Sequence, residues 1–144
     1  MITISAFKWV PEFAQGQVRD LRARWALEEA GLPYKTRLLE QGDQDKPDYR
    51  ALQPFGQVPI LEEDGLVLFE SGAIVLHIGE RCETLLPADP AGRARAVTWL
   101  LAALNSMECL PENLAGRQWY FPTDRGLEKR IQERLEEFRR LRSR

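Results

Sequence analysis

The stretch Gln53–Ser71, QPFGQVPILEEDGLVLFES, places a proline where the neighbouring residues predict a β-strand. Pro59 is followed by a short apolar run, a turn at Glu63-Asp64-Gly65 and a second apolar run. Two apolar runs separated by Asp-Gly are a strong signal for a β-hairpin. Proline cannot donate to a β-ladder, so it belongs at the start or edge of a strand, and it holds the preceding Val58 extended. The stretch therefore predicts a hairpin that is entered through an extended Val58-Pro59 pair.

Both ends of this hairpin have features of a ligand site. We expect a cis Val58-Pro59 bond, which turns the chain sharply and leaves the N–H and C=O of Val58 without a strand partner. Such groups can pair with an extended peptide by strand addition. Glu70 and Ser71 stand where the hairpin ends and a helix begins, and a helix start with a hydroxyl cap is a ready site for a carboxylate. Together these features predict a site for a short peptide with an anionic end.

The rest of the chain predicts strand–helix–strand, then hairpin–helix. Alternating and helical patterns place, in chain order, a strand over 2–7, a helix over 17–30, a strand over 34–39, a short helix over 48–52 and, after the hairpin, a helix over 71–82. A strand–helix–strand unit implies a right-handed crossover and parallel pairing. The order β-α-β-α-β-β-α is that of an α/β thioredoxin-like domain.

The helix expected over 17–30 carries an apolar stripe of Val18, Leu21 and Trp25, which alanines and Leu27 widen. Gly31 should end it as a left-handed glycine cap.

We expect three segments: a thioredoxin-like domain over 1–82, a linker over 83–88, and a small all-α domain over 89–144. Asp89-Pro90 has the N-cap and first-turn proline of a long helix that ends or kinks at Pro111. A last amphipathic helix is expected around 127–138, after an aromatic loop over 118–123.

Composition excludes several classes of partner. The 144 residues carry a net charge of −2, which gives no reason to expect nucleic acid or an anionic membrane as a partner. No apolar run approaches the roughly 20 residues of a membrane helix, and the N-terminus lacks a signal-peptide pattern. Cys82 and Cys109 have no C-x-x-C spacing, and His77, the single histidine, has no ligand cluster around it. A cytoplasmic, reduced protein without a metal site is expected.

The run PFGQVPI, followed by a hairpin and FESGAIVLHIGE, resembles the glutathione-binding half of the glutathione S-transferase superfamily. The resemblance extends to LRARWALEEAGLPY (21–34) and LLPADPAGRARAVTWL (85–100), and so covers most of residues 1–110. It implies a homodimer that binds glutathione as co-substrate or ligand, together with an electrophilic or apolar second ligand. Family members have a longer helical domain, so the resemblance implies that 89–144 is truncated. The glutathione-binding residues that it implies are Gln57, Val58, Pro59, Glu70 and Ser71.

The residues that should activate the thiol depart from the family pattern. Family members place a Tyr, Ser or Cys just after the first strand or at the next helix start, whereas residues 7–17 here read FKWVPEFAQGQ, without a hydroxyl or thiol. A donor matters because a free thiol has a pKa of about 8.5 and is mostly protonated at neutral pH. Ser5 lies within the strand and could face either way. The other candidates are neutral donors from Trp9 or Gln15, charge from Lys8 or Arg19, and backbone N–H groups at the helix start. No catalytic residue is assigned.

Three functions remain open. The first is a glutathione transferase-like enzyme whose bound thiolate attacks an electrophile. The second is a glutathione-binding or ligand-carrying protein without significant turnover, which the missing hydroxyl favours. The third is a non-catalytic dimerisation or interaction module, against which the Glu70-Ser71 pair argues. We expect a conjugating activity that is absent or low.

Overall fold

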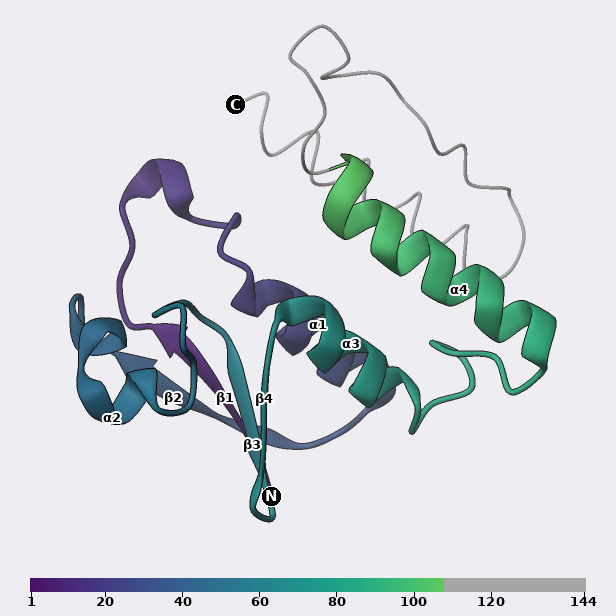
Figure 1. The fold of residues 1–144 in the computed structure, drawn as a ribbon, viewed down its shortest axis with the longest axis horizontal. Coiled ribbons are helices and arrows are strands. Elements are labelled where there is room, and N and C mark those ends of the chain that lie inside the picture. Colours follow the sequence, from purple (N-terminus) through teal and green to yellow (C-terminus); the bar gives the residue numbers. More distant parts are fainter. Residues whose placement is uncertain (108–144) are drawn as a thin grey trace, which may run out of the picture. The chain divides into compact units, whose positions relative to one another are not determined.

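The computed structural model describes residues 1–107, which fold around a four-stranded mixed sheet (Figure 1). The strands are β1 (Ile2–Phe7), β2 (Tyr34–Leu39), β3 (Ile60–Glu63) and β4 (Leu66–Phe69), in the spatial order β2-β1-β3-β4. β1 pairs in parallel with β2 along its whole length, and β3 is antiparallel to both β1 and β4. The expected hairpin is therefore present, with β3 as an inner strand and β4 at the edge.

Two helices lie between strands along the chain and two follow the hairpin, in the order that the sequence predicts. They are α1 (Asp20–Ala30), α2 (Pro47–Arg50), α3 (Ser71–Gly79) and α4 (Pro90–Ala102), with short 3-10 turns at Glu12–Ala14 and Asp43–Asp45 and a π-helical turn at Ala103–Met107. The order through α3 is β-α-β-α-β-β-α, which confirms the thioredoxin-like α/β fold.

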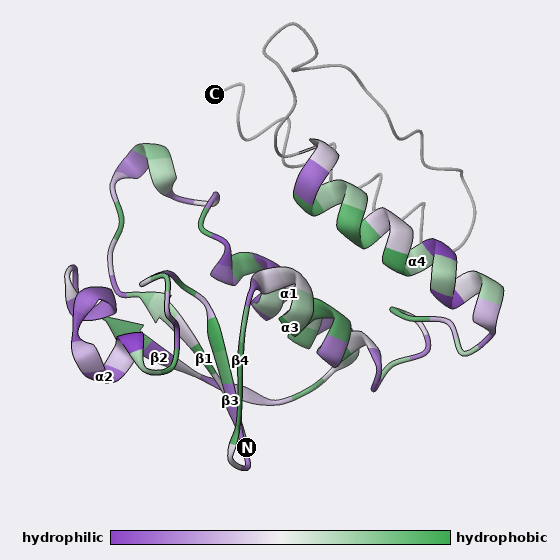
Figure 2. Ribbon diagram, viewed as in Figure 1, coloured by the Kyte–Doolittle hydropathy of each residue, from purple (hydrophilic) through white to green (hydrophobic). Residues whose placement is uncertain are grey.

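Two apolar clusters lie on opposite faces of the sheet. The larger is packed between α1, α3 and the sheet, and its fully buried members include Ile4, Leu27 and Ile74. The smaller lies under α2, where Tyr49 packs with Leu39, Val58 and Ile60. Neighbouring residues of a strand point to opposite faces of the sheet. In β1, Ile4 therefore packs in the first cluster, while Ser5 contacts Tyr49 of the second. Figure 2 shows apolar residues along β4 and on α3.

α1 differs from its predicted helix in start and in buried face. It begins at Asp20, three residues later than expected, and ends at Gly31, which has φ +66° as a glycine cap requires. The predicted stripe is right in part: Leu21 and Trp25 are 38% and 49% exposed, whereas Ala23, Ala26 and Leu27, which were expected to widen the stripe, are buried. The alanines face inward because α1 packs closely against α3. The pattern of large residues was therefore misleading. α3 also ends earlier than predicted, at Gly79.

The segment expected as a linker packs against the domain before it. Leu86 is 7% exposed, and its N–H donates to the C=O of Cys82. Asp89 then caps α4, because its Oδ1 accepts from the N–H of Gly92 at 2.7 Å. Met1–Glu108 form one compact unit. The boundaries at 82 and 89 stay a prediction, and the expected kink at Pro111, the aromatic loop and the last helix fall outside the described residues. Within residues 1–107, no helix is long and apolar enough to cross a membrane.

Candidate functional site

Val58 lies in the loop before β3, where no described residue pairs with either of its main-chain polar groups. The Val58-Pro59 peptide bond is cis, as expected. The paired residues of β3 begin at Ile60, and within residues 1–107 no hydrogen bond uses the N–H or C=O of Val58. Polar main-chain groups at a largely buried residue normally have partners. The unpaired N–H and C=O of Val58 are therefore available to a ligand.

The main chain on both sides of Val58 is held by a chain of hydrogen bonds. The N–H of Ile60 donates to Ser5 Oγ at 2.8 Å, Ser5 Oγ lies 2.9 Å from Tyr49 Oη, and Tyr49 Oη donates to the C=O of Gln57 at 2.8 Å. Each hydroxyl has one hydrogen, so Ser5 must donate to Tyr49. Burial raises the pKa of Tyr49. The phenol therefore stays protonated, as this series of hydrogen bonds requires.

This arrangement settles the open question about Ser5. Its side chain is fully buried and supports the loop, so it is not a thiol donor. Tyr49 was missed by sequence reasoning. The signal was a single aromatic residue in a short, otherwise polar helix, where burial against the sheet is the usual explanation.

The start of α3 forms the second part of the site. Glu70 is its N-cap with φ +70°, a backbone conformation that costs a non-glycine residue about 1–3 kcal/mol. Ser71 is the first helical residue, so the expected hydroxyl cap is wrong by one position. The reason is that β4 turns directly into α3 at Glu70, whose side chain makes no cap bond. Ser71 is 5% exposed, and its Oγ accepts from Arg22 Nη1 at 3.4 Å.

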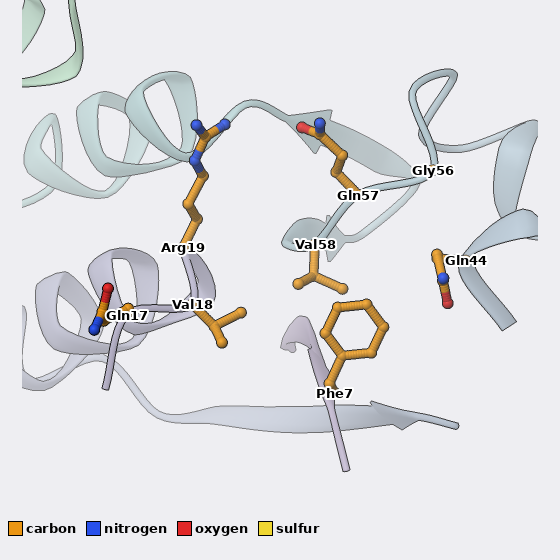
Figure 3. A pocket seen from close by; sticks show the side chains of 8 residues that line it. All are labelled: Phe7, Gln17, Val18, Arg19, Gln44, Gly56, Gln57 and Val58. Atoms are coloured by element: carbon orange, nitrogen blue, oxygen red, sulfur yellow. The ribbon is translucent and has the colours of Figure 1, made fainter. Parts of the chain in front are cut away.

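Two hollows bring the predicted site residues into reach of a ligand. The loop hollow has a volume of about 320 Å³ and is lined by Val58 with, among others, Phe7, Gln17, Val18, Arg19 and Gln57 (Figure 3). The helix hollow has a volume of about 460 Å³. Its polar lining residues are Arg19, Arg22, Glu70 and Ser71, and its apolar ones include Val97, Leu100 and Leu101 of α4 and Leu104 of the π-helical turn that follows. Four of the five predicted residues thus line a hollow, whereas Pro59 is buried and lines neither.

Of the four side chains considered as thiol donors, one lines these hollows. Trp9 is 63% exposed and lines neither. Gln15 directs its amide nitrogen to the C=O of Val10, at 3.5 Å. Lys8 pairs with Glu40 at 2.6 Å, and this hydrogen bond raises the pKa of the Lys8 ammonium. Arg19 lines both hollows.

The single histidine has a structural environment. His77 Nε2 lies 2.9 Å from Arg81 Nη2 and 3.8 Å from Glu63 Oε2, in a group that ties the hairpin to the end of α3. Among residues 1–107, no group of three His, Cys, Asp or Glu side chains is placed to hold a metal ion.

Comparison with known proteins agrees with this geometry. Residues 14–80 match the glutathione S-transferase N-terminal domain family. Glutathione S-transferase 4 of Zea mays is 48% identical over 59 residues, which is 40% of this chain and 26% of the relative. A probable glutathione S-transferase of Oryza sativa subsp. japonica is 33% identical over 128 residues, which is 80% of this chain and 57% of the relative.

A solved structure gives the same result. The theta class glutathione S-transferase from the citrus canker pathogen Xanthomonas axonopodis pv. citri, with glutathione bound, superimposes with a TM-score of 0.61 at 32% identity, over 81% of this chain and 59% of that chain. This chain spans between about a quarter and just over half of the length of the two curated relatives. The fold, the matched domain and the relatives all support the glutathione S-transferase superfamily as the family of this chain.

Proposed function

We propose that this chain binds glutathione between the loop at Val58 and the start of α3. The observation that carries the proposal is the unpaired N–H and C=O of Val58 beside the loop hollow. The cysteinyl residue of glutathione is an extended peptide unit, whose own N–H and C=O match these two groups. Val58 thus fixes the middle of the ligand.

The start of α3 suits the γ-glutamyl end of the ligand. That end carries a carboxylate and an ammonium group. The carboxylate meets the hydroxyl of Ser71 and the first N–H groups of α3, while the ammonium meets the carboxylate of Glu70. Gln57, which is exposed and lines the loop hollow, lies on the side of the glycyl end.

The reaction that this placement supports is the conjugation of glutathione, through its sulfur, to an electrophile. The thiol loses its proton to solvent, and the thiolate then forms a sulfur–carbon bond as the leaving group departs from the acceptor. The apolar lining residues of the helix hollow, which include those of α4 and of the turn that follows, suit an acceptor with an apolar body.

A second candidate is glutathione binding with little turnover. It is favoured by the residues that line the two hollows. Among the described residues, Ser71 is the one hydroxyl side chain in that lining, and it lies at the γ-glutamyl end rather than at the thiol. A non-catalytic interaction module is the third, and it is the least compatible with the unpaired groups of Val58.

The protein is further proposed to be a cytoplasmic homodimer. Leu21 and Trp25 on α1 and Trp99 on α4 expose large apolar side chains. Closed two-fold pairing is the commonest way in which such surfaces are buried in soluble proteins.

Two titrations and one rate measurement test these alternatives. Calorimetric titration with glutathione should show saturable binding, and S-methylglutathione should bind too, because the methyl group leaves the Val58 and Ser71 contacts intact. Turnover on a small electrophile then separates the enzyme from the carrier. A flat calorimetric response to both ligands contradicts the proposed function and leaves the interaction module.

A further inference from the structure

Arg19 lines both hollows of the site. It immediately precedes α1, and Figure 3 shows its guanidinium extended to the same side of the loop hollow as the carboxamide of Gln57. The apolar side chains of Phe7, Val18 and Val58 gather on the other side. A ligand that runs from Val58 in one hollow to Ser71 in the other therefore passes Arg19.

Three other polar side chains near the two hollows are less well placed than Arg19 to reach the middle of the ligand. Gln17 lines the loop hollow, but its amide nitrogen donates to the C=O of Phe13 at 3.2 Å. Lys8 is paired with Glu40, and Ser71 belongs to the γ-glutamyl end. Arg22 lines the helix hollow and donates to Ser71 at the γ-glutamyl end, whereas Arg19 is, among residues 1–107, the charged side chain that lines both hollows.

We propose that the guanidinium of Arg19 lies against the thiol sulfur of bound glutathione and stabilises the thiolate, in place of a hydroxyl. The inference rests on the proposed function. The step is a deprotonation: the sulfur keeps the electron pair of the S–H bond, the proton passes to solvent, and the arginine stays protonated throughout. A guanidinium has five N–H donors, so Arg19 can serve the sulfur together with a protein partner.

The charged residues that line the helix hollow favour this deprotonation. Arg19 and Arg22 line the helix hollow with one carboxylate, that of Glu70, which the ammonium group of the ligand neutralises. A positive charge within about 4–6 Å lowers the pKa of an acid by about 1–3 units. An arginine acts on the thiolate chiefly through its charge, so a lysine at this position should retain part of the effect, whereas a neutral glutamine should retain none.

The test measures the bound thiol and the binding affinity separately. The pKa of the bound thiol is followed by the ultraviolet absorbance of the thiolate during a pH titration of the glutathione complex. Affinity is measured by calorimetry with S-methylglutathione, which has no ionisable thiol. Wild type is compared with Arg19→Gln, Arg19→Lys and the control Arg95→Gln, which changes an exposed arginine of α4 that lines neither hollow.

The expected result is a change in the pKa of the bound thiol without a change in the affinity for S-methylglutathione. Arg19→Gln should raise the pKa of the bound thiol by about one unit, a tenfold loss in the thiolate equilibrium constant, and Arg19→Lys by less. Both should bind S-methylglutathione within about twofold of wild type, because neither the Val58 nor the Ser71 contact is altered. Arg95→Gln should match wild type in both measurements.

Two results overturn the inference while leaving the proposed function intact. One is a bound thiol with the same pKa in wild type and Arg19→Gln. The other is a loss of S-methylglutathione affinity of about tenfold or more without a change in that pKa, which assigns Arg19 to a carboxylate of the ligand. A wild-type protein that binds neither ligand overturns the proposed function, and this inference with it.

Discussion

Replacing Tyr49 with phenylalanine removes one hydroxyl from the hydrogen bonds that hold the loop around Val58. The phenol makes two contacts, to Ser5 Oγ at 2.9 Å and to the C=O of Gln57 at 2.8 Å. The aromatic ring stays, including its position under the guanidinium of Arg37 at 5.9 Å. The substitution therefore changes hydrogen bonding and leaves packing almost unaltered.

The cost follows from which groups lose a partner. The hydroxyl hydrogen of Ser5 is left in a fully buried position, where an unsatisfied donor costs about 1–3 kcal/mol. Gln57 is exposed, so water can replace the phenol at its C=O and little is lost there. We therefore expect Tyr49→Phe to lower the free energy of unfolding by about 2 kcal/mol. The less firmly held loop should also weaken glutathione binding, because the competent conformation becomes less populated.

Urea denaturation and calorimetric titration measure the two effects. Tyr34→Phe is the matched control, since the hydroxyl of Tyr34 donates to the exposed carboxylate of Glu28 at 3.1 Å. Loss of this exposed hydrogen bond should lower the free energy of unfolding by no more than about 0.5 kcal/mol. If Tyr49→Phe unfolds at the same urea concentration as wild type and binds glutathione equally well, the hydrogen-bond chain does not position the loop.

Three further outcomes are expected. Ser71→Ala and Glu70→Gln should each weaken glutathione binding by about 1.5–3 kcal/mol in calorimetry while leaving thermal unfolding cooperative, and unchanged affinity removes these residues from the site. Light scattering should return the mass of a dimer, whereas a monomer mass at micromolar concentration refutes the proposed assembly. Arg81 lowers the pKa of the Glu63 carboxyl. The stabilisation from this pair is therefore present above the ordinary carboxyl pKa of 4.5 and is lost as the pH falls through the lower folded value. Denaturant midpoints of wild type and Glu63→Gln should thus converge on acidification, and a constant difference contradicts the assignment.

Much of the fold was predictable because its signals are local. The hairpin follows from Asp64-Gly65 between two apolar runs, and the end of α1 follows from Gly31, whose positive φ few other residues adopt. β1 was placed correctly by its alternation, and β2 by its position after the helix-ending Gly31 and Pro33. The resemblance to a known family then supplied the proposed ligand and the residues expected to contact it.

The errors and omissions are cases in which tertiary packing decided the outcome. Leu21 and Trp25 are larger and more apolar than the alanines of α1, yet close packing against α3 selects the alanines for the core. The roles of Ser5 and Tyr49 depend on a contact across 44 residues of sequence, which no local pattern reveals. The choice of Arg19 among four candidate thiol donors required the structure, because it depends on where Lys8, Trp9 and Gln15 lie relative to the hollows.

The central claim is that Val58 pairs through its main chain with the cysteinyl residue of glutathione while the γ-glutamyl end lies at the start of α3. A crystal structure of the protein grown with glutathione tests this claim most directly. We expect the N–H of Val58 to donate to the ligand, the C=O of Val58 to accept from it, and the γ-glutamyl carboxylate to lie at Ser71. Glutathione bound elsewhere, with the main-chain groups of Val58 facing water or protein, contradicts it.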